Sequence, residues 1–240
     1  MIFFSILIFI VALSSINNIC SNLYIRISSI ILLYSGLLSL NVINIPAVGS
    51  GIGLFNGLFH VTLISQFMDC FIFIIGSLIL VSWPLINNNN SFASLNNKIK
   101  KINTYAIEYS LLILFSTLGA SFLVSSADIV SMYLSIELQS FGIYILSTIF
   151  RDSDSATSAG LKYFLLGGLS SCLILLGGGL IYSYTGLTNF EAIYSLISII
   201  NTNKIIQGLN LGFILIIFGL LFKIAASPQL GVNKKDIQHF

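Results

Sequence analysis

Long apolar runs that contain few or no charges are the feature that most constrains this chain. The hydrocarbon core of a bilayer is about 30 Å thick, and a helix needs about 20 mainly apolar residues to cross it. The stretches that meet or approach this requirement are residues 2–16, 23–43, 61–86, 105–124, 129–150, 158–184 and 205–226. We therefore expect about seven membrane-spanning helices, of which the first is the shortest.

The scarcity of charge excludes the other classes of protein. The 240 residues include 10 basic and 8 acidic ones, or 8%, whereas soluble proteins have roughly 25%. Disorder requires low hydrophobicity, but 56% of these residues are hydrophobic. The net charge of +2 makes nucleic acid a poor partner. Because an open sheet leaves backbone groups unpaired in lipid, the expected fold class is all-α, a polytopic transmembrane helix bundle.

Cysteine and histidine give no sign of a metal site. Cys20, Cys70 and Cys172 have no C-x-x-C spacing, and His60 and His239 are isolated. Free cysteines usually behave as small apolar side chains. We therefore expect the chain to hold neither a metal nor an iron–sulfur centre.

Basic residues gather on one side of the membrane if the spans alternate in direction. That side receives Arg26, Lys98, Lys100, Lys101, Arg151, Lys234 and Lys235. The other side receives Lys204. The positive-inside rule then places the N-terminus outside and the C-terminus of this chain inside.

Two connections on the outer side have recognisable patterns. Residues 46–59 are rich in glycine, and we expect a turn-rich loop, because a phosphate-binding loop needs a βαβ unit around it. Residues 188–191, from Thr188 to Glu191, have the pattern of a capping box. This pattern predicts a short helix over 190–200 that lies in the membrane interface.

Ionisable residues inside the spans indicate function. A charge at the bilayer centre costs roughly 2.5–3.5 kcal/mol, so such a group usually faces a partner or water. Glu137 lies eight residues into the fifth span, or about 12 Å along a helix. Its spacing alone allows two roles, a proton carrier or a structural carboxyl that is hydrogen-bonded to a neighbouring helix.

Three further ionisable residues have structural alternatives. Lys162, early in the sixth span, either snorkels to the headgroups or shares a polar path with Glu137, about 10–15 Å away along the membrane axis. Lys223 is late in the seventh span, and its position alone favours snorkelling. Asp69 is expected near the outer interface or in a structural hydrogen bond.

Small residues predict close packing in the sixth span. Gly160, Gly167 and Ser171 share one helical face, a pattern typical of membrane helices that approach closely. The run from Gly177 to Gly179 allows further close approach or flexibility.

Four strings of residues resemble one family. They are residues 125–140 (SSADIVSMYLSIELQS), 161–167 (LKYFLLG), 184–190 (YTGLTNF) and 219–226 (GLLFKIAA). In this order they resemble the subunit 2 family of mitochondrial NADH dehydrogenase (complex I), whose members are antiporter-like and proton-translocating. The resemblance covers about residues 100–228, and the first 100 residues agree only in hydropathy and topology.

The resemblance implies a family fold of about 14 helices, of which this chain holds the N-terminal half. Residues 1–100 would form three helices and a polar loop. Residues 101–228 would form part of the first proton-translocation repeat, and residues 229–240 a polar tail that does not match. Glu137, Lys162 and Lys223 match the family's proton carriers.

The resemblance also implies a setting. The chain would work in the mitochondrial inner membrane beside other membrane subunits of complex I and in contact with the lipid bilayer. It would bind no cofactor, because NADH and ubiquinone are used by the whole complex. An independent cation/proton antiporter is the alternative, since it would share the buried Glu and Lys.

The family pattern is lost at Gln229. Ser227 and Pro228 fit it, but Leu230 occupies the position of a family histidine. We expect a truncated product, with residues 229–240 read from an intron, and a non-functional fragment is a third possibility.

Overall fold

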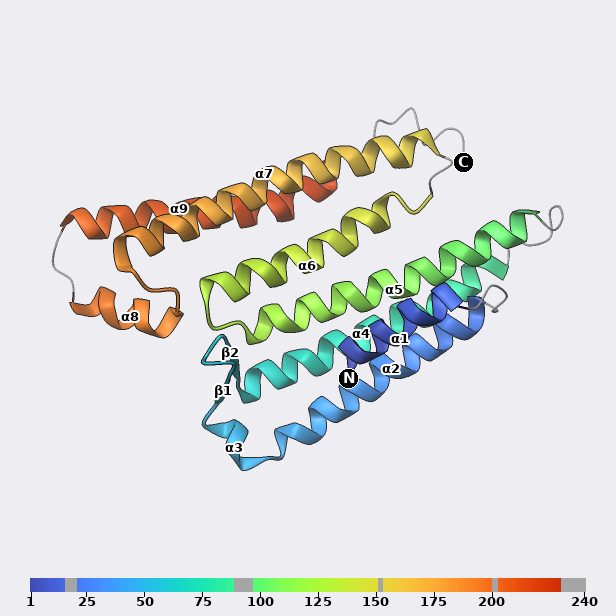
Figure 1. Ribbon diagram of the computed structural model, residues 1–240, viewed down its shortest axis with the longest axis horizontal. Coiled ribbons are helices and arrows are strands. Elements are labelled where there is room, and N and C mark those ends of the chain that lie inside the picture. Colours follow the sequence, from blue (N-terminus) through green and yellow to red (C-terminus); the bar gives the residue numbers. More distant parts are fainter. Residues whose placement is uncertain (16–20, 89–96, 151–152, 200–202, 230–240) are drawn as a thin grey trace.

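The computed structural model describes residues 1–15, 21–88, 97–150, 153–199 and 203–229. The elements are α1 (Ile2–Ser15), α2 (Ser21–Ile43), α3 (Pro46–Gly49), β1 (Ile52–Leu54), β2 (Phe59–Val61), α4 (Leu63–Asn88), α5 (Asn97–Ser125), α6 (Ile129–Ser147), α7 (Asp154–Thr185), α8 (Phe190–Ile199) and α9 (Asn203–Gln229). The long helices run side by side (Figure 1). They confirm the predicted all-α bundle.

Six of the described helices are long and apolar enough to cross a membrane, namely α2, α4, α5, α6, α7 and α9. The predicted first span is the exception. Helix α1 has 14 residues, which is short of the roughly 20 that a crossing needs. Ile2, Ile6 and Phe9, which recur every three or four residues, are buried against the neighbouring helices. The predicted first span, residues 2–16, is therefore not among these six, and because residue 16 lies outside the described residues its crossing of the membrane stays a prediction.

The long helices alternate in direction. The last turns of α1, α4 and α6 and the first turns of α2, α5 and α7 lie toward one end of the bundle (Figure 1). Helix α5 begins at Asn97, so its first turns hold three lysines that were expected in a loop, Lys98, Lys100 and Lys101. Arg151, Lys234 and Lys235 lie outside the described residues. The membrane side that this end faces stays a prediction.

The connection after α2 contains a hairpin as well as turns. Strand β1 pairs antiparallel with β2, and Phe55 and Asn56 between them have φ angles of 52° and 57°. Positive φ at both central residues is typical of the tight turns that join twisted strands. Strands of three residues are too short to give a recognisable alternation, which is why the sequence predicted a loop alone.

Segments far apart in the sequence meet beside this hairpin. The N–H of Ala127 donates to the carbonyl of Leu58 at 3.0 Å, and the N–H of Ile129 donates to the carbonyl of Thr188 at 3.0 Å. The N–H of Phe190 donates to the carbonyl of Ala127 at 3.1 Å. The segment from Ala127 to Ile129, which leads into α6, is therefore held between the hairpin and the segment before α8.

The predicted short helix is present as α8, and its cap differs from the expected one. The side-chain oxygen of Asn189 accepts hydrogen bonds from the backbone N–H groups of Glu191 (2.9 Å) and Ala192 (3.4 Å). An asparagine at this position satisfies N–H groups that the helix itself leaves unpaired. The capping residue is thus Asn189 and not Thr188. Residue 200 of the predicted range lies outside the described residues.

Two apolar clusters hold the bundle together. The first joins α1, α2, α4 and α5 around side chains such as Ile25, Leu32 and Leu114. The second joins α6, α7, α8 and α9 around side chains such as Ile181 and Ile216. Between the clusters α5 packs against α6, so the two groups form one continuous body.

The outer surface of the helices is apolar, as a lipid environment requires. On α4, for example, Ile64 is 74% exposed and Phe67 is 64% exposed. Buried hydroxyls bond within their own helix: Ser28 donates to the carbonyl of Ile25 at 2.9 Å, and Ser170 donates to that of Gly167 at 2.6 Å. Such bonds satisfy polar side chains where no water can do so.

Candidate functional site

An ion pair joins α6 to α9 within the span region. The ammonium of Lys223 lies 3.0 Å from Oε1 of Glu137, and the two side chains are only 15% and 16% exposed. Lys223 therefore points into the bundle. Its position in the sequence alone had favoured snorkelling to the interface, which the structure does not show. The pair supplies the partner that a charge in a membrane span requires.

Ser140 completes this arrangement. Lys223 Nζ also donates a hydrogen bond to Ser140 Oγ at 3.2 Å. The serine hydroxyl in turn bonds to the carbonyls of Ile136 (2.8 Å) and Glu137 (3.0 Å). Residues three or four apart share a helical face, so Ser140 lies directly beside Glu137. The ammonium thus has a charged and a neutral oxygen partner within one turn of α6.

Polar residues continue along the same face of α6. Tyr133, Glu137, Ser140 and Tyr144 are spaced by four, three and four residues, and this spacing keeps them in one line. The line extends for about 16 Å at 1.5 Å per residue. Glu137 acts electrostatically on both tyrosine hydroxyls. Together these four residues are called the α6 polar line below.

Glycines bring the helices close enough for this pairing. A Cβ added to Gly177 of α7 would lie 2.7 Å from the carbonyl oxygen of Gly212 in α9, and one added to Gly219 would lie 2.9 Å from that of Ser170. Neither distance is available to a real side chain. The predicted approach at Gly177 and Gly178 is confirmed, while Gly179 has nothing within 4 Å of its added Cβ.

The predicted small-residue face of α7 packs against α6. Gly160 lies against Thr148, and Gly167 lies against the hydroxyl of Tyr144. Ser171, on the same face, is buried. The prediction of close packing on this face is confirmed.

Lys162 does not join the pair. Its side chain is exposed on α7. It lies five residues before Gly167, or about 140° around the helix at 100° per residue, so it does not share the face that meets α6. Among the described residues no ion pair of Lys162 is found. Its role in a proton path stays a prediction.

Asp69 is buried in α4. It is 9% exposed and lies six residues into the helix, about 9 Å from its first residue, which suits the expected place near one interface. Within the described part of the chain its Oδ1 atom has no hydrogen-bond partner. The structural hydrogen bond that was the other expectation for Asp69 is therefore not found at Oδ1.

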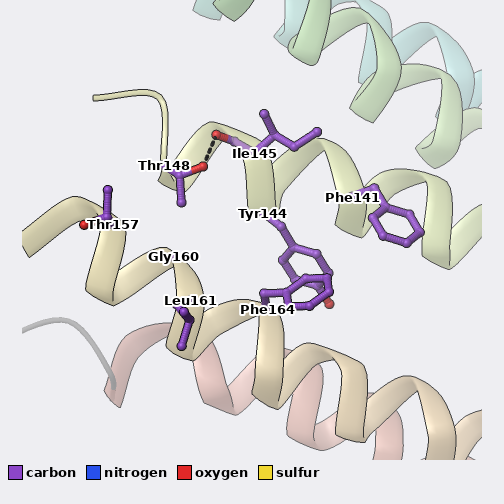
Figure 2. A pocket seen from close by; sticks show the side chains of 8 residues that line it. All are labelled: Phe141, Tyr144, Ile145, Thr148, Thr157, Gly160, Leu161 and Phe164. Carbon is purple, nitrogen blue, oxygen red and sulfur yellow. Dashed lines mark hydrogen bonds between the residues drawn. The ribbon is translucent and has the colours of Figure 1, made fainter. Parts of the chain in front are cut away.

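A groove separates α6 from α7 beyond Tyr144. Its volume is about 410 Å³, and it is lined by Phe141, Tyr144, Ile145, Thr148, Thr157, Gly160, Leu161 and Phe164. Figure 2 shows the ring of Tyr144 extending from α6 toward α7 beside Phe164. The groove therefore begins at the end of the α6 polar line and continues toward the α6–α7 connection.

Ser140, Tyr133 and Tyr144 were not singled out by sequence reasoning. A usable signal was present, because polar residues at i, i+4, i+7 and i+11 in an otherwise apolar helix mark one face. Hydroxyl groups are common in membrane helices as local backbone partners, so they indicate a functional site less clearly than charged residues do.

The fold and the site define a class of protein, namely a membrane helix bundle with a buried Glu–Lys pair between two of its spans. Residues 126–229 match a family model described as NADH:quinone oxidoreductase/Mrp antiporter, transmembrane. Over these residues the chain is similar to this antiporter-like family.

Sequence relatives extend over nearly the whole chain. NADH-ubiquinone oxidoreductase chain 2 of Rhizopus oryzae is 51% identical over 235 residues, which covers 95% of this chain and 44% of the relative. NADH-quinone oxidoreductase subunit N of Pelagibacter ubique is 36% identical and covers 90% of this chain and 46% of the relative. Similarity therefore includes the first 100 residues, where only hydropathy and topology had been recognised.

Solved structures share the fold. A chain of respiratory complex I from Thermus thermophilus with bound aureothin has a TM-score of 0.63 at 22% identity, and the match covers 92% of this chain and 43% of that one. This chain thus spans somewhat less than half the length of the relatives that it matches.

Proposed function

We propose that this chain contributes a proton path to the membrane arm of an NADH:quinone oxidoreductase, respiratory complex I. The observation that carries the proposal is the Glu137–Lys223 pair, a bonded acid and base inside a bundle that is similar to an antiporter-like family. Relatives at 51% and 36% identity are named as chains of such oxidoreductases.

The pair has the chemistry of a proton switch. When Glu137 is ionised, its carboxylate holds the ammonium of Lys223 by a charge-assisted hydrogen bond. When a proton arrives at the carboxylate, this attraction is lost, and Lys223 is free to turn toward other acceptors and to give up its own proton. Two arrangements of one pair, biased by a single proton, are the kind of bistable element that a coupled pump needs.

Lys162 is proposed as a later carrier in the same path. It lies on α7, whose neighbours are α6 and α9, the two helices that hold the pair. Water would bridge it to Lys223, because its side chain is exposed and does not share the Gly167 face. Glu137, Lys223 and Lys162 would then pass protons in turn.

The setting follows from the relatives. We propose that the chain lies in the mitochondrial inner membrane, with its N-terminus in the intermembrane space and the C-terminus of this chain on the matrix side. Basic residues such as Arg26 and Lys98, near the same end of the bundle, support this orientation. Other membrane subunits of the complex would cover its exposed apolar helices. The NADH and quinone chemistry would belong to other subunits, and this chain would hold no redox cofactor.

The test measures proton transfer in the complete NADH-oxidising assembly, reconstituted into lipid vesicles. Glu137→Gln keeps the shape of the side chain but cannot ionise, so we expect fewer protons moved per NADH oxidised. Glu191→Gln, the same change on an exposed residue of α8, is the matched control. Pumping by Glu137→Gln equal to that of the control would refute the proposal.

An independent cation/proton antiporter remains the second candidate, because the family description includes antiporters. The two differ in assembly. On a native gel a subunit of the oxidoreductase migrates with a large NADH-oxidising complex, whereas a separate antiporter does not.

A further inference from the structure

Tyr144 has a buried hydroxyl without a partner at the end of the α6 polar line. The side chain is 7% exposed, and among the described residues its hydroxyl oxygen makes no hydrogen bond. A buried hydroxyl left unpaired costs about 1–3 kcal/mol, and most such groups in proteins are paired. The structure therefore keeps this hydroxyl buried without a hydrogen-bond partner among the described residues.

The surroundings hold the ring firmly. Tyr163 and Phe164 of α7 contact it edge to face, with ring centroids 5.1 Å and 5.7 Å away. The hydroxyl itself lies against Gly167, where any side chain would collide with it. An aromatic ring needs no hydroxyl for these contacts, so packing explains the ring and leaves the oxygen unexplained.

The oxygen lies next to the ion pair's own network. Glu137 acts electrostatically on the Tyr144 hydroxyl, and the Ser140 hydroxyl lies close to it. Ser140 also accepts a hydrogen bond from Lys223. Ser140 is one helical turn from Tyr144 on the same face of α6. On its other side Tyr144 lines the groove between α6 and α7, which continues toward Thr148 and Thr157. The hydroxyl is thus the polar group between the pair and the groove.

We infer that Tyr144 is a proton-relay residue that connects the Glu137–Lys223 pair to the α6–α7 groove. Its hydroxyl accepts a proton from a protonated water on the groove side, which is left as neutral water, and passes its own proton through the Ser140 hydroxyl to the Glu137 carboxylate, which becomes protonated. The Tyr144 oxygen ends with one proton, as it began. The net result is the transfer of one proton from the groove to Glu137. The inference rests on the proposed function, because it concerns the path by which protons reach Glu137.

Tyr144→Phe tests the relay, because it removes only the oxygen and keeps the ring contacts. The assay is protons moved per NADH oxidised by the complete assembly in lipid vesicles. We expect Tyr144→Phe to lower this ratio as much as Glu137→Gln does, while the amount of assembled complex stays unchanged. Tyr163→Phe makes the same chemical change in a ring that touches Tyr144 but lies off the α6 polar line, and we expect it to pump normally.

The outcomes separate the two proposals. Normal pumping by Tyr144→Phe together with reduced pumping by Glu137→Gln overturns the relay and leaves the proposed function standing. Normal pumping by both overturns the proposed function. Equal losses in Tyr144→Phe and Tyr163→Phe also overturn the relay, because aromatic packing would then be the property that matters.

Discussion

Lys223→Met replaces the ammonium with an apolar side chain of similar length and leaves the Glu137 carboxylate without its cation. Two unit charges 3.0 Å apart attract by about 5 kcal/mol at an effective dielectric constant of about 20. The loss of hydration offsets much of this attraction while the pair is intact. Removing one partner of a buried pair costs about 3–5 kcal/mol. Because both side chains retain some exposure, at 15% and 16%, we expect about 3 kcal/mol.

A double-mutant cycle measures this coupling. We expect Glu137→Gln and Lys223→Met each to lower the free energy of unfolding, and the double variant to lose much less than the sum, because it leaves no unpaired charge. The measurement is denaturant unfolding of the purified protein in mixed lipid–detergent micelles. Lys162→Met, the same change at an exposed lysine, is the control and should stay within about 0.5 kcal/mol of the parent.

Additive losses would show that the two charges are not coupled. If Lys223→Met costs less than about 1 kcal/mol and the double variant loses the sum of the single ones, the two charges do not stabilise each other in the bundle. Pumping assays on the same three variants distinguish the roles further. The double variant should regain stability but not proton transfer, because neither titrating group remains.

Lys162 and Gly177 give two further predictions. Lys162→Ala should reduce proton transfer without changing the amount of assembled complex, since the described structure gives this lysine no ion pair; pumping at the parental level would remove Lys162 from the path. Gly177→Ala should destabilise the bundle by about 1–3 kcal/mol, because its Cβ would lie 2.7 Å from the carbonyl oxygen of Gly212. Gly179→Ala, with nothing within 4 Å of its added Cβ, should be tolerated when thermal unfolding of both variants is compared.

The membrane helices could be predicted because their hydropathy alone determines their structure in lipid. An uncharged apolar run of 20 residues has one stable form in lipid, so α2, α4, α5, α6, α7 and α9 follow from hydropathy alone. The ends of helices were less predictable. Asn88, Lys98, Lys100 and Lys101 suggested a loop, but α4 extends to Asn88 and α5 begins at Asn97, so these polar residues lie in terminal turns of helices.

The site was only partly predictable, because side-chain direction is not a property of one helix. Glu137 was recognised from its depth in an apolar span. Lys223 lies near the end of its span, where one chain read alone favours snorkelling; the partner that turns it inward is 86 residues away in the sequence. The resemblance to a family suggested a role for Lys223, but it did not indicate direct contact with Glu137.

The position of the ion pair depends on a closed circuit of contacts through three helices. Lys223 reaches Ser140 on α6 at 3.2 Å. One turn along α6, Tyr144 rests on Gly167 of α7. One turn along α7, the carbonyl of Ser170 lies against Gly219 of α9. One further turn along α9 returns to Lys223.

Each step of this circuit on α7 uses a residue that lacks a side chain or has a very small one. An alanine at Gly219 would push α9 away from α7 and move Lys223 relative to Glu137 without altering either charge. Hydrogen bonds depend steeply on distance and direction. A shift of this kind therefore weakens the Glu137–Lys223 pair although both charges remain. The glycines of α7 and α9 therefore belong to the functional site in an energetic sense, although none of them can bind a proton.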